Sequence, residues 1–136
     1  MKEYKSTLEV SSDDFKVWNN YGNALMEIKE YKKAIEAYDK ALKINPQYTT
    51  ALYNKGIALS KISKYNQAIR SYDEVLGIDP GKVKVWINKG NSLSFIGKNK
   101  EALKCYDKLL ELEPGNVKAK FNKKLILESK DKCGGF

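Results

Sequence analysis

The sequence repeats itself every 34 residues, and this period restricts the fold more than any other feature. The three prolines, Pro46, Pro80 and Pro114, are each separated by 34 residues. Four other residue types keep the same spacing over three copies: glycine at 22, 56 and 90, alanine at 34, 68 and 102, tyrosine at 38, 72 and 106, and leucine at 25, 59 and 93. Such a period is typical of repeat proteins, in which each unit packs mainly against its neighbours.

Each copy is predicted to form two amphipathic helices. Apolar residues recur at intervals of three and four, first at Trp18, Tyr21 and Leu25 and then at Ala34 and Tyr38, which places them on one face of a helix. Each proline lacks a backbone donor and disfavours helix at the residue before it, so it ends the second helix of its copy. We predict helices over 15–28, 31–44, 49–62, 65–78, 83–96, 99–112 and 117–130.

The repeated glycines and tyrosines are expected to have packing roles. A glycine inside a helix costs about 1 kcal/mol relative to alanine. Gly22, Gly56 and Gly90 are therefore expected where two helix backbones approach closely, facing the repeated alanines. The tyrosines have the volume to fill the wedge between neighbouring repeats, with the hydroxyl at a polar rim. These positions describe the scaffold and indicate little about function.

The pattern resembles the tetratricopeptide repeat (TPR), a 34-residue helix-turn-helix unit with Trp, Gly, Ala, a large aromatic residue and Pro at fixed offsets. The first copy has them at Trp18, Gly22, Ala34, Tyr38 and Pro46. The resemblance implies an all-α fold, an α-solenoid that forms a right-handed superhelix of three repeats, over 15–48, 49–82 and 83–116. The second and third copies depart from the pattern at Lys55, Val75, Lys89 and Leu109.

The ends of the chain differ from complete repeats. Apolar residues at 4, 8 and 10 lie 34 residues before those at 38, 42 and 44, so residues 1–14 are interpreted as part of a preceding repeat. Asp13 and Asp14 precede Phe15 and are expected to cap the first complete helix. Residues 117–130 are expected to form a polar capping helix, because Lys124 replaces the glycine and stacked repeats need a solvated end. Residues 131–136 are expected to be a flexible tail of this single solenoid domain.

The resemblance implies that a peptide or partner protein binds on the concave face, which the first helix of each repeat lines. The family's groove offsets give fourteen principal candidates: Lys16, Asn19, Asn20, Asn23, Tyr53, Asn54, Ile57, Lys84, Ile87, Asn88, Asn91, Phe95, Phe121 and Asn122. Further residues at matching offsets are Glu27, Thr50, Lys61, Lys118 and Leu125.

An asparagine column runs through these positions, at 20, 54, 88 and 122. Asparagine is both a donor and an acceptor, so a ladder of them is expected to hold the backbone of an extended peptide. Apolar neighbours predict pockets, and the lysines favour an acidic segment or a terminal carboxylate. One TPR subclass binds the C-terminal carboxylate of heat-shock chaperones. Asn23, Asn54 and Lys84 match its clamp, but Asn19 and Asn88 replace cations, which disfavours that partner.

The composition argues against catalysis. The chain has no histidine, and the sequence shows no Gly-rich phosphate loop, nucleophile elbow or metal-ligand cluster. We therefore predict that it is not an enzyme and requires no cofactor or metal. No apolar run approaches the roughly 18 residues of a membrane span, and no signal peptide is readable at Met1, so we expect a cytoplasmic protein. Cys105 and Cys133 cannot form a disulfide framework.

Two other functions stay open. The net charge of +8 is compatible with RNA, but Arg70 is the single arginine among 25 basic residues, and arginine is the side chain that forks onto phosphates and stacks on bases. Nucleic acid is therefore the less favoured partner. Alternatively, the partial repeat or the tail could make the chain a self-assembly scaffold, giving a homo-oligomer.

Overall fold

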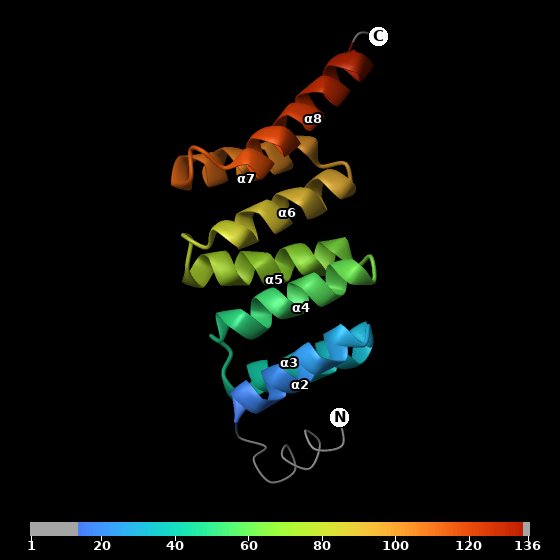
Figure 1. The fold of residues 1–136 in the computed structure, drawn as a ribbon, viewed down its shortest axis with the longest axis vertical. Coiled ribbons are helices and arrows are strands. Elements are labelled where there is room, and N and C mark those ends of the chain that lie inside the picture. The colour runs from blue at the N-terminus through green and yellow to red at the C-terminus, as the bar shows by residue number, and fades with distance from the viewer. Residues whose placement is uncertain (1–13, 135–136) are drawn as a thin grey trace.

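The computed structural model describes residues 14–134, and this part of the chain forms seven α-helices. They are α2 (Phe15–Glu27), α3 (Tyr31–Ile44), α4 (Thr49–Lys61), α5 (Tyr65–Ile78), α6 (Val83–Phe95), α7 (Asn99–Leu112) and α8 (Val117–Gly134). Each helix packs against the next, so the helices form an elongated stack with α2 and α8 at its two ends (Figure 1). The expected all-α solenoid is confirmed. No helix among residues 14–134 is long and apolar enough to cross a membrane.

The helix limits agree with the sequence pattern to within one residue from α2 to α7. The last helix differs, because α8 ends at Gly134 instead of 130. Residues 131–134 of the predicted tail therefore continue the helix, and residues 135 and 136 lie outside the described residues. The predicted half-repeat at residues 1–13, including Asp13, lies outside the described residues. Asp14 does cap α2, because its Oδ1 accepts a hydrogen bond from the Lys16 backbone at 2.9 Å.

Each first helix ends in the same turn, which reverses the chain into the second helix. At the end of α2, the Glu30 backbone N–H donates to the Leu25 carbonyl at 2.9 Å, and Lys29 has a positive φ of 63°. Ser63 and Gly97 occupy the equivalent left-handed position in the next two repeats. These hydrogen bonds satisfy carbonyl groups that would otherwise lack a donor at the helix end. The three turns therefore fix the same hairpin geometry three times.

The repeated glycines lie against the repeated tyrosines. A Cβ added to Gly22, Gly56 or Gly90 would come within 3.0 Å of the ring of Tyr38, Tyr72 or Tyr106, respectively. The nearest atoms to each glycine are those of a tyrosine ring, a contact that the sequence pattern did not predict. Each tyrosine also belongs to a core cluster that includes residues of the next helix pair, such as Ala51 and Ala58 for Tyr38 and Val85 for Tyr72, as expected for a residue at the junction of two repeats. Each of the three is at most 1% exposed.

We predict that Gly56→Ala lowers the free energy of unfolding by about 1–3 kcal/mol, the usual cost of overpacking a core. Its new methyl group would overlap the buried ring of Tyr72. The control is Gly77→Ala, because Gly77 is also helical but has open space around it. This control should stabilise the protein by about 0.5–1 kcal/mol. Urea unfolding measures both effects, and equal shifts in the same direction would contradict the packing role.

Candidate functional site

The first helices α2, α4, α6 and α8 carry all of the predicted groove residues, and we call the surface formed by these residues the first-helix face. At its beginning, Asn54 of α4 joins two side chains of α2. The Asn54 Nδ2 group donates to Asn19 Oδ1 at 3.2 Å and to Asn23 Oδ1 at 3.1 Å. The Tyr38 hydroxyl donates to the same Asn23 oxygen at 2.7 Å. The Asn23 oxygen therefore accepts hydrogen bonds both from the next repeat and from the buried Tyr38 of its own repeat.

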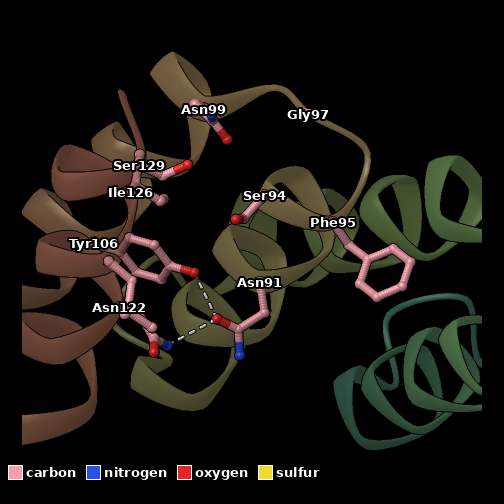
Figure 2. Close-up of a pocket in the computed structure, with 10 residues that line it drawn as sticks. Asn91, Ser94, Phe95, Gly97, Asn99, Tyr106, Asn122, Ile126 and Ser129 are labelled. Carbon is pink, nitrogen blue, oxygen red and sulfur yellow. Dashed lines mark hydrogen bonds between the residues drawn. The ribbon is translucent and has the colours of Figure 1, made fainter. Parts of the chain in front are cut away.

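The same arrangement recurs at the other end of the stack. Asn122 of α8 donates through Nδ2 to Asn91 Oδ1 of α6 at 2.9 Å, and the Tyr106 hydroxyl donates to that oxygen at 2.6 Å (Figure 2). The middle interface differs, because Ile57 occupies the position of Asn23 and Asn91. There Asn88 Nδ2 donates to the Tyr53 hydroxyl at 2.7 Å. We call these inter-helix bonds the asparagine network.

The asparagine network changes the interpretation of the predicted ladder. The Nδ2 groups of Asn54, Asn88 and Asn122 bond neighbouring helices together, a role that sequence reasoning missed. The sequence spacing that indicates these bonds is 31 residues and not the 34-residue period. Asn54 follows its acceptor Asn23 by 31 residues, and Asn122 follows its acceptor Asn91 by the same number. Within residues 14–134 the Oδ1 atoms of the three donors accept no hydrogen bond. These amide oxygens therefore remain available as acceptors.

The predicted groove residues differ in accessibility. Asn19 is only 3% exposed, so its side chain serves the interface of α2 and α4 and is closed to a ligand. Half-buried positions are Tyr53, Asn54, Ile57, Ile87, Asn88 and Asn122; exposed positions are Lys16, Asn20, Asn23, Lys84, Asn91, Phe95 and Phe121. Phe95 is 73% exposed and Phe121 is 58% exposed. The α6–α8 end of the first-helix face therefore displays large apolar side chains to solvent.

Charge on the first-helix face is mainly positive. Lys16, Lys61, Lys84 and Lys118 stand at groove offsets and form no ion pair within the part of the chain that the structure describes. Glu27 is the one acidic side chain at these offsets. Because charges act through solvent, these lysines give the face a positive potential.

The lysines that depart from the TPR pattern have a structural explanation. Lys55 pairs with Asp39 of the preceding repeat at 2.7 Å, Lys89 pairs with Asp73, and Lys123 repeats the arrangement one copy later. The pairs are half-exposed, so each contributes at most about 1 kcal/mol. These lysines therefore support repeat stacking, whereas the groove lysines form no ion pair within the described residues.

A pocket of about 400 Å³ opens between α6, α7 and α8 (Figure 2). Its polar lining includes Ser94, Asn99 and Ser129, which sequence reasoning did not select, together with the predicted Asn91 and Asn122. A second, more apolar pocket of about 230 Å³ lies beside Tyr53 and Lys84. Both pockets contain residues of the first-helix face.

Nothing in the described region resembles a catalytic centre. No group of three or more His, Cys, Asp or Glu side chains among these residues could hold a metal ion. Cys105 is buried, and burial raises the pKa of its thiol to about 11. A thiol that stays protonated at neutral pH is a poor nucleophile. Cys105 therefore belongs to the core of α7.

Stacked helical hairpins with a solvent-exposed first-helix face define a helical repeat scaffold. The sequence matches the family described as TPR repeat over residues 22–63 and the tetratricopeptide repeat over 49–82 and 83–116. The chain belongs to the tetratricopeptide repeat family, a non-catalytic scaffold family.

Three similar proteins illustrate the family. The peroxisomal targeting signal receptor of Kluyveromyces lactis is 37% identical over 51 residues, which are 38% of this chain and only 9% of the receptor. The Arabidopsis OM64 TPR domain is 28% identical with a TM-score of 0.79, and the match covers 85% of this chain and 95% of that domain. The second TPR domain of human RPAP3, in complex with the HSP70 peptide SGPTIEEVD, is 28% identical with a TM-score of 0.76, covering 80% and 91%.

We predict that Asn54→Ala lowers the free energy of unfolding by about 1–3 kcal/mol. The substitution removes the bonds between α2 and α4 and leaves the buried Asn19 oxygen without its donor. Asn20→Ala, one repeat earlier in the same column, is the matched control, because Asn20 is exposed and makes no hydrogen bond within residues 14–134. It should change stability by less than about 0.5 kcal/mol in thermal or urea unfolding. Equal losses from both variants would argue against the network.

Stability should also fall at alkaline pH because of the buried tyrosines. Burial raises the pKa of Tyr72 to about 12, whereas an unfolded tyrosine titrates near 10. Between these values the folded chain keeps a proton that the unfolded chain has lost, so the free energy of unfolding decreases as pH rises through this window. Tyr72→Phe should make this decrease less steep. Urea unfolding from pH 9 to 11.5 measures the slope, and an unchanged slope would refute the assignment.

Proposed function

We propose that the chain binds an extended peptide segment of a partner protein along the first-helix face, which serves as the groove. The supporting observation is the combination of exposed apolar side chains and unoccupied hydrogen-bond acceptors on the same helices. Phe95, Phe121 and Leu125 are all between 49% and 73% exposed. Large apolar side chains gathered on one face are typical of an interaction site.

Backbone recognition would use the acceptor half of the asparagine column. Asn54, Asn88 and Asn122 are spaced one repeat apart, and their amide oxygens have no donor within residues 14–134. Peptide N–H groups can donate to these oxygens without regard to the peptide's side chains. The asparagine network holds each amide in place, so a ligand would lose little entropy in ordering them.

The positive charge of the first-helix face and the chain's similarity to a peptide-bound TPR domain both favour an acidic ligand. The four groove lysines form no ion pair within residues 14–134, and the RPAP3 domain that resembles this chain is complexed with a peptide ending in EEVD. This chain lacks two cations of the chaperone clamp, at Asn19 and Asn88, and Asn19 is buried. We therefore propose an acidic segment with apolar anchors in preference to a chaperone C-terminus.

A matched pair of substitutions on α8 tests the groove. Leu125 is 49% exposed on the first-helix face, and Leu127 is 41% exposed on the same helix at the position of the core leucine column. An array of acidic 12-residue peptides should bind the wild-type chain. On the peptides it binds, Leu125→Ala should weaken binding by about fivefold or more, since burying half a leucine contributes about 1 kcal/mol.

Leu127→Ala is the control and should bind the same peptides within about twofold of the wild type. The groove assignment fails if the two variants weaken binding equally, or if no peptide binds to the wild-type protein. Thermal unfolding of both variants would show that each is folded at the assay temperature.

A further inference from the structure

The pocket between α6, α7 and α8 exists because two positions that are large in the preceding repeat are small here. Tyr65 begins α5 and Phe95 ends α6, and their rings stack with centroids 4.5 Å apart and an interplanar angle of 30°. The residues 34 positions later are Asn99, which begins α7, and Ser129 in α8. A stacked aromatic pair therefore covers the equivalent place one repeat earlier, with Phe95 73% exposed, and residues 99 and 129 supply no counterpart.

Figure 2 shows how the third repeat leaves this space open. The side chains of Ser94, Asn99 and Ser129 surround the pocket, whereas the ring of Phe95 points away toward the preceding repeat. Ile126 is 6% exposed and supplies a buried apolar wall. A volume of about 400 Å³ lies within the range of pockets that take small ligand groups.

The lining specifies the chemistry of an occupant. One wall is apolar, and Ser94, Asn99 and Ser129 supply small polar side chains. No buried side-chain nitrogen or oxygen among the described residues lacks a hydrogen-bond partner, so any unbonded polar atoms of these three face the solvent in the pocket. An aromatic ring would restore the packing that Tyr65 and Phe95 provide one repeat earlier. A hydroxyl on that ring would meet partners in the polar side chains, which buried tyrosine requires.

We propose that this pocket receives a tyrosine side chain of a foreign acidic peptide. The proposal rests on the proposed function, because the peptide must already lie along the first-helix face. It goes further by naming the anchor residue and the space that the residue fills.

The groove lysines set the position of the acidic residues relative to this tyrosine. Lys84 and Lys118 precede Phe95 and Ser129 by 11 residues on α6 and α8, which is about 16 Å along a helix. Neither lysine forms an ion pair in the region described. An extended peptide spans that distance in about five residues. The segment that reaches the pocket is therefore expected to turn from the asparagine column and run along α6 and α8, with an acidic residue about five positions from the tyrosine.

Three defined probes test the anchor. Each is a fluorescein-labelled peptide of serine and glycine with glutamate five positions before and after a central tyrosine, phenylalanine or alanine. Fluorescence anisotropy with the full chain should give an affinity for the tyrosine probe about tenfold or more above that for the alanine probe. The phenylalanine probe should fall between them. Equal binding of the tyrosine and alanine probes would overturn the proposal.

A filled-pocket variant tests the location. Asn99→Tyr with Ser129→Phe recreates the pair found one repeat earlier, and the tyrosine and alanine probes should then bind within about twofold of each other. The control is Glu128→Phe, which adds the same ring to an exposed neighbouring position of α8 and should keep the preference for tyrosine. Thermal unfolding checks the fold, and Ser129→Phe alone provides the same comparison if the double variant does not fold. A preference that survives filling would place the anchor elsewhere and refute the proposal.

Two further outcomes separate this inference from the proposed function. If the peptide array binds and depends on Leu125 but the three probes bind alike, the groove stands and the tyrosine pocket fails. If light scattering shows that the wild-type chain self-associates and the filled variant is monomeric, the occupant is a second copy, which overturns the assignment to a foreign peptide.

Discussion

The contact between a tyrosine ring and a glycine backbone is the interaction on which the rest of this structure depends. Within each hairpin the ring occupies the space that a side chain at the glycine would fill, as at Gly22 and Tyr38, so the two helices can approach only to the thickness of the ring. The contact also positions the tyrosine hydroxyl. In the first repeat that hydroxyl donates to Asn23, which in turn accepts from Asn54 of the next repeat. Packing inside the first hairpin thereby helps to determine where the second hairpin is bonded, and Tyr106, Asn91 and Asn122 repeat the arrangement at the last interface.

The three repeats have the same periodic core residues but different surface residues. The core residues serve stability, and the surface residues are free to serve recognition. The tyrosines of the three repeats are equally buried, but the asparagine network is interrupted in the middle, where Ile57 replaces asparagine and Asn88 bonds to Tyr53 instead. The aromatic pair of Tyr65 and Phe95 likewise occurs once. Because each unit contacts mainly its neighbours, such local changes alter one interface without disturbing the others. A repeat scaffold can therefore vary its binding surface position by position.

The sequence was sufficient to predict the helices, because the proline period and the apolar spacing act locally. The limits of α2 to α7 are correct to within one residue. The partners of the repeated residues were harder to predict. The period identifies equivalent positions, but not which columns touch, so the contact of the glycines with the tyrosine rings was not predicted. The bonds of Asn54 and the pairing of Lys55 with Asp39 depend on how far one hairpin is rotated against the next, which is a property of packed side chains. The pocket was missed for a related reason, since Asn99 and Ser129 are inconspicuous until compared with Tyr65 and Phe95 in space.

The last helix shows why the apolar surface at this end points to a ligand and not only to an incomplete stack. A capping helix needs polar residues where the next helix would pack, and α8 meets that need with Lys120 and Lys124, both exposed. Solubility would be served equally well by polar residues at the groove offsets of the same helix. Those offsets instead carry Phe121 and Leu125, which are 58% and 49% exposed. An exposed aromatic and an exposed leucine on an otherwise lysine-rich helix add nothing to capping, whereas both would gain by burial against a peptide. The partly exposed Leu127, in the core leucine column, is the apolar position that an incomplete stack explains, whereas the exposed Phe121 and Leu125 at the groove offsets are best explained by a binding role.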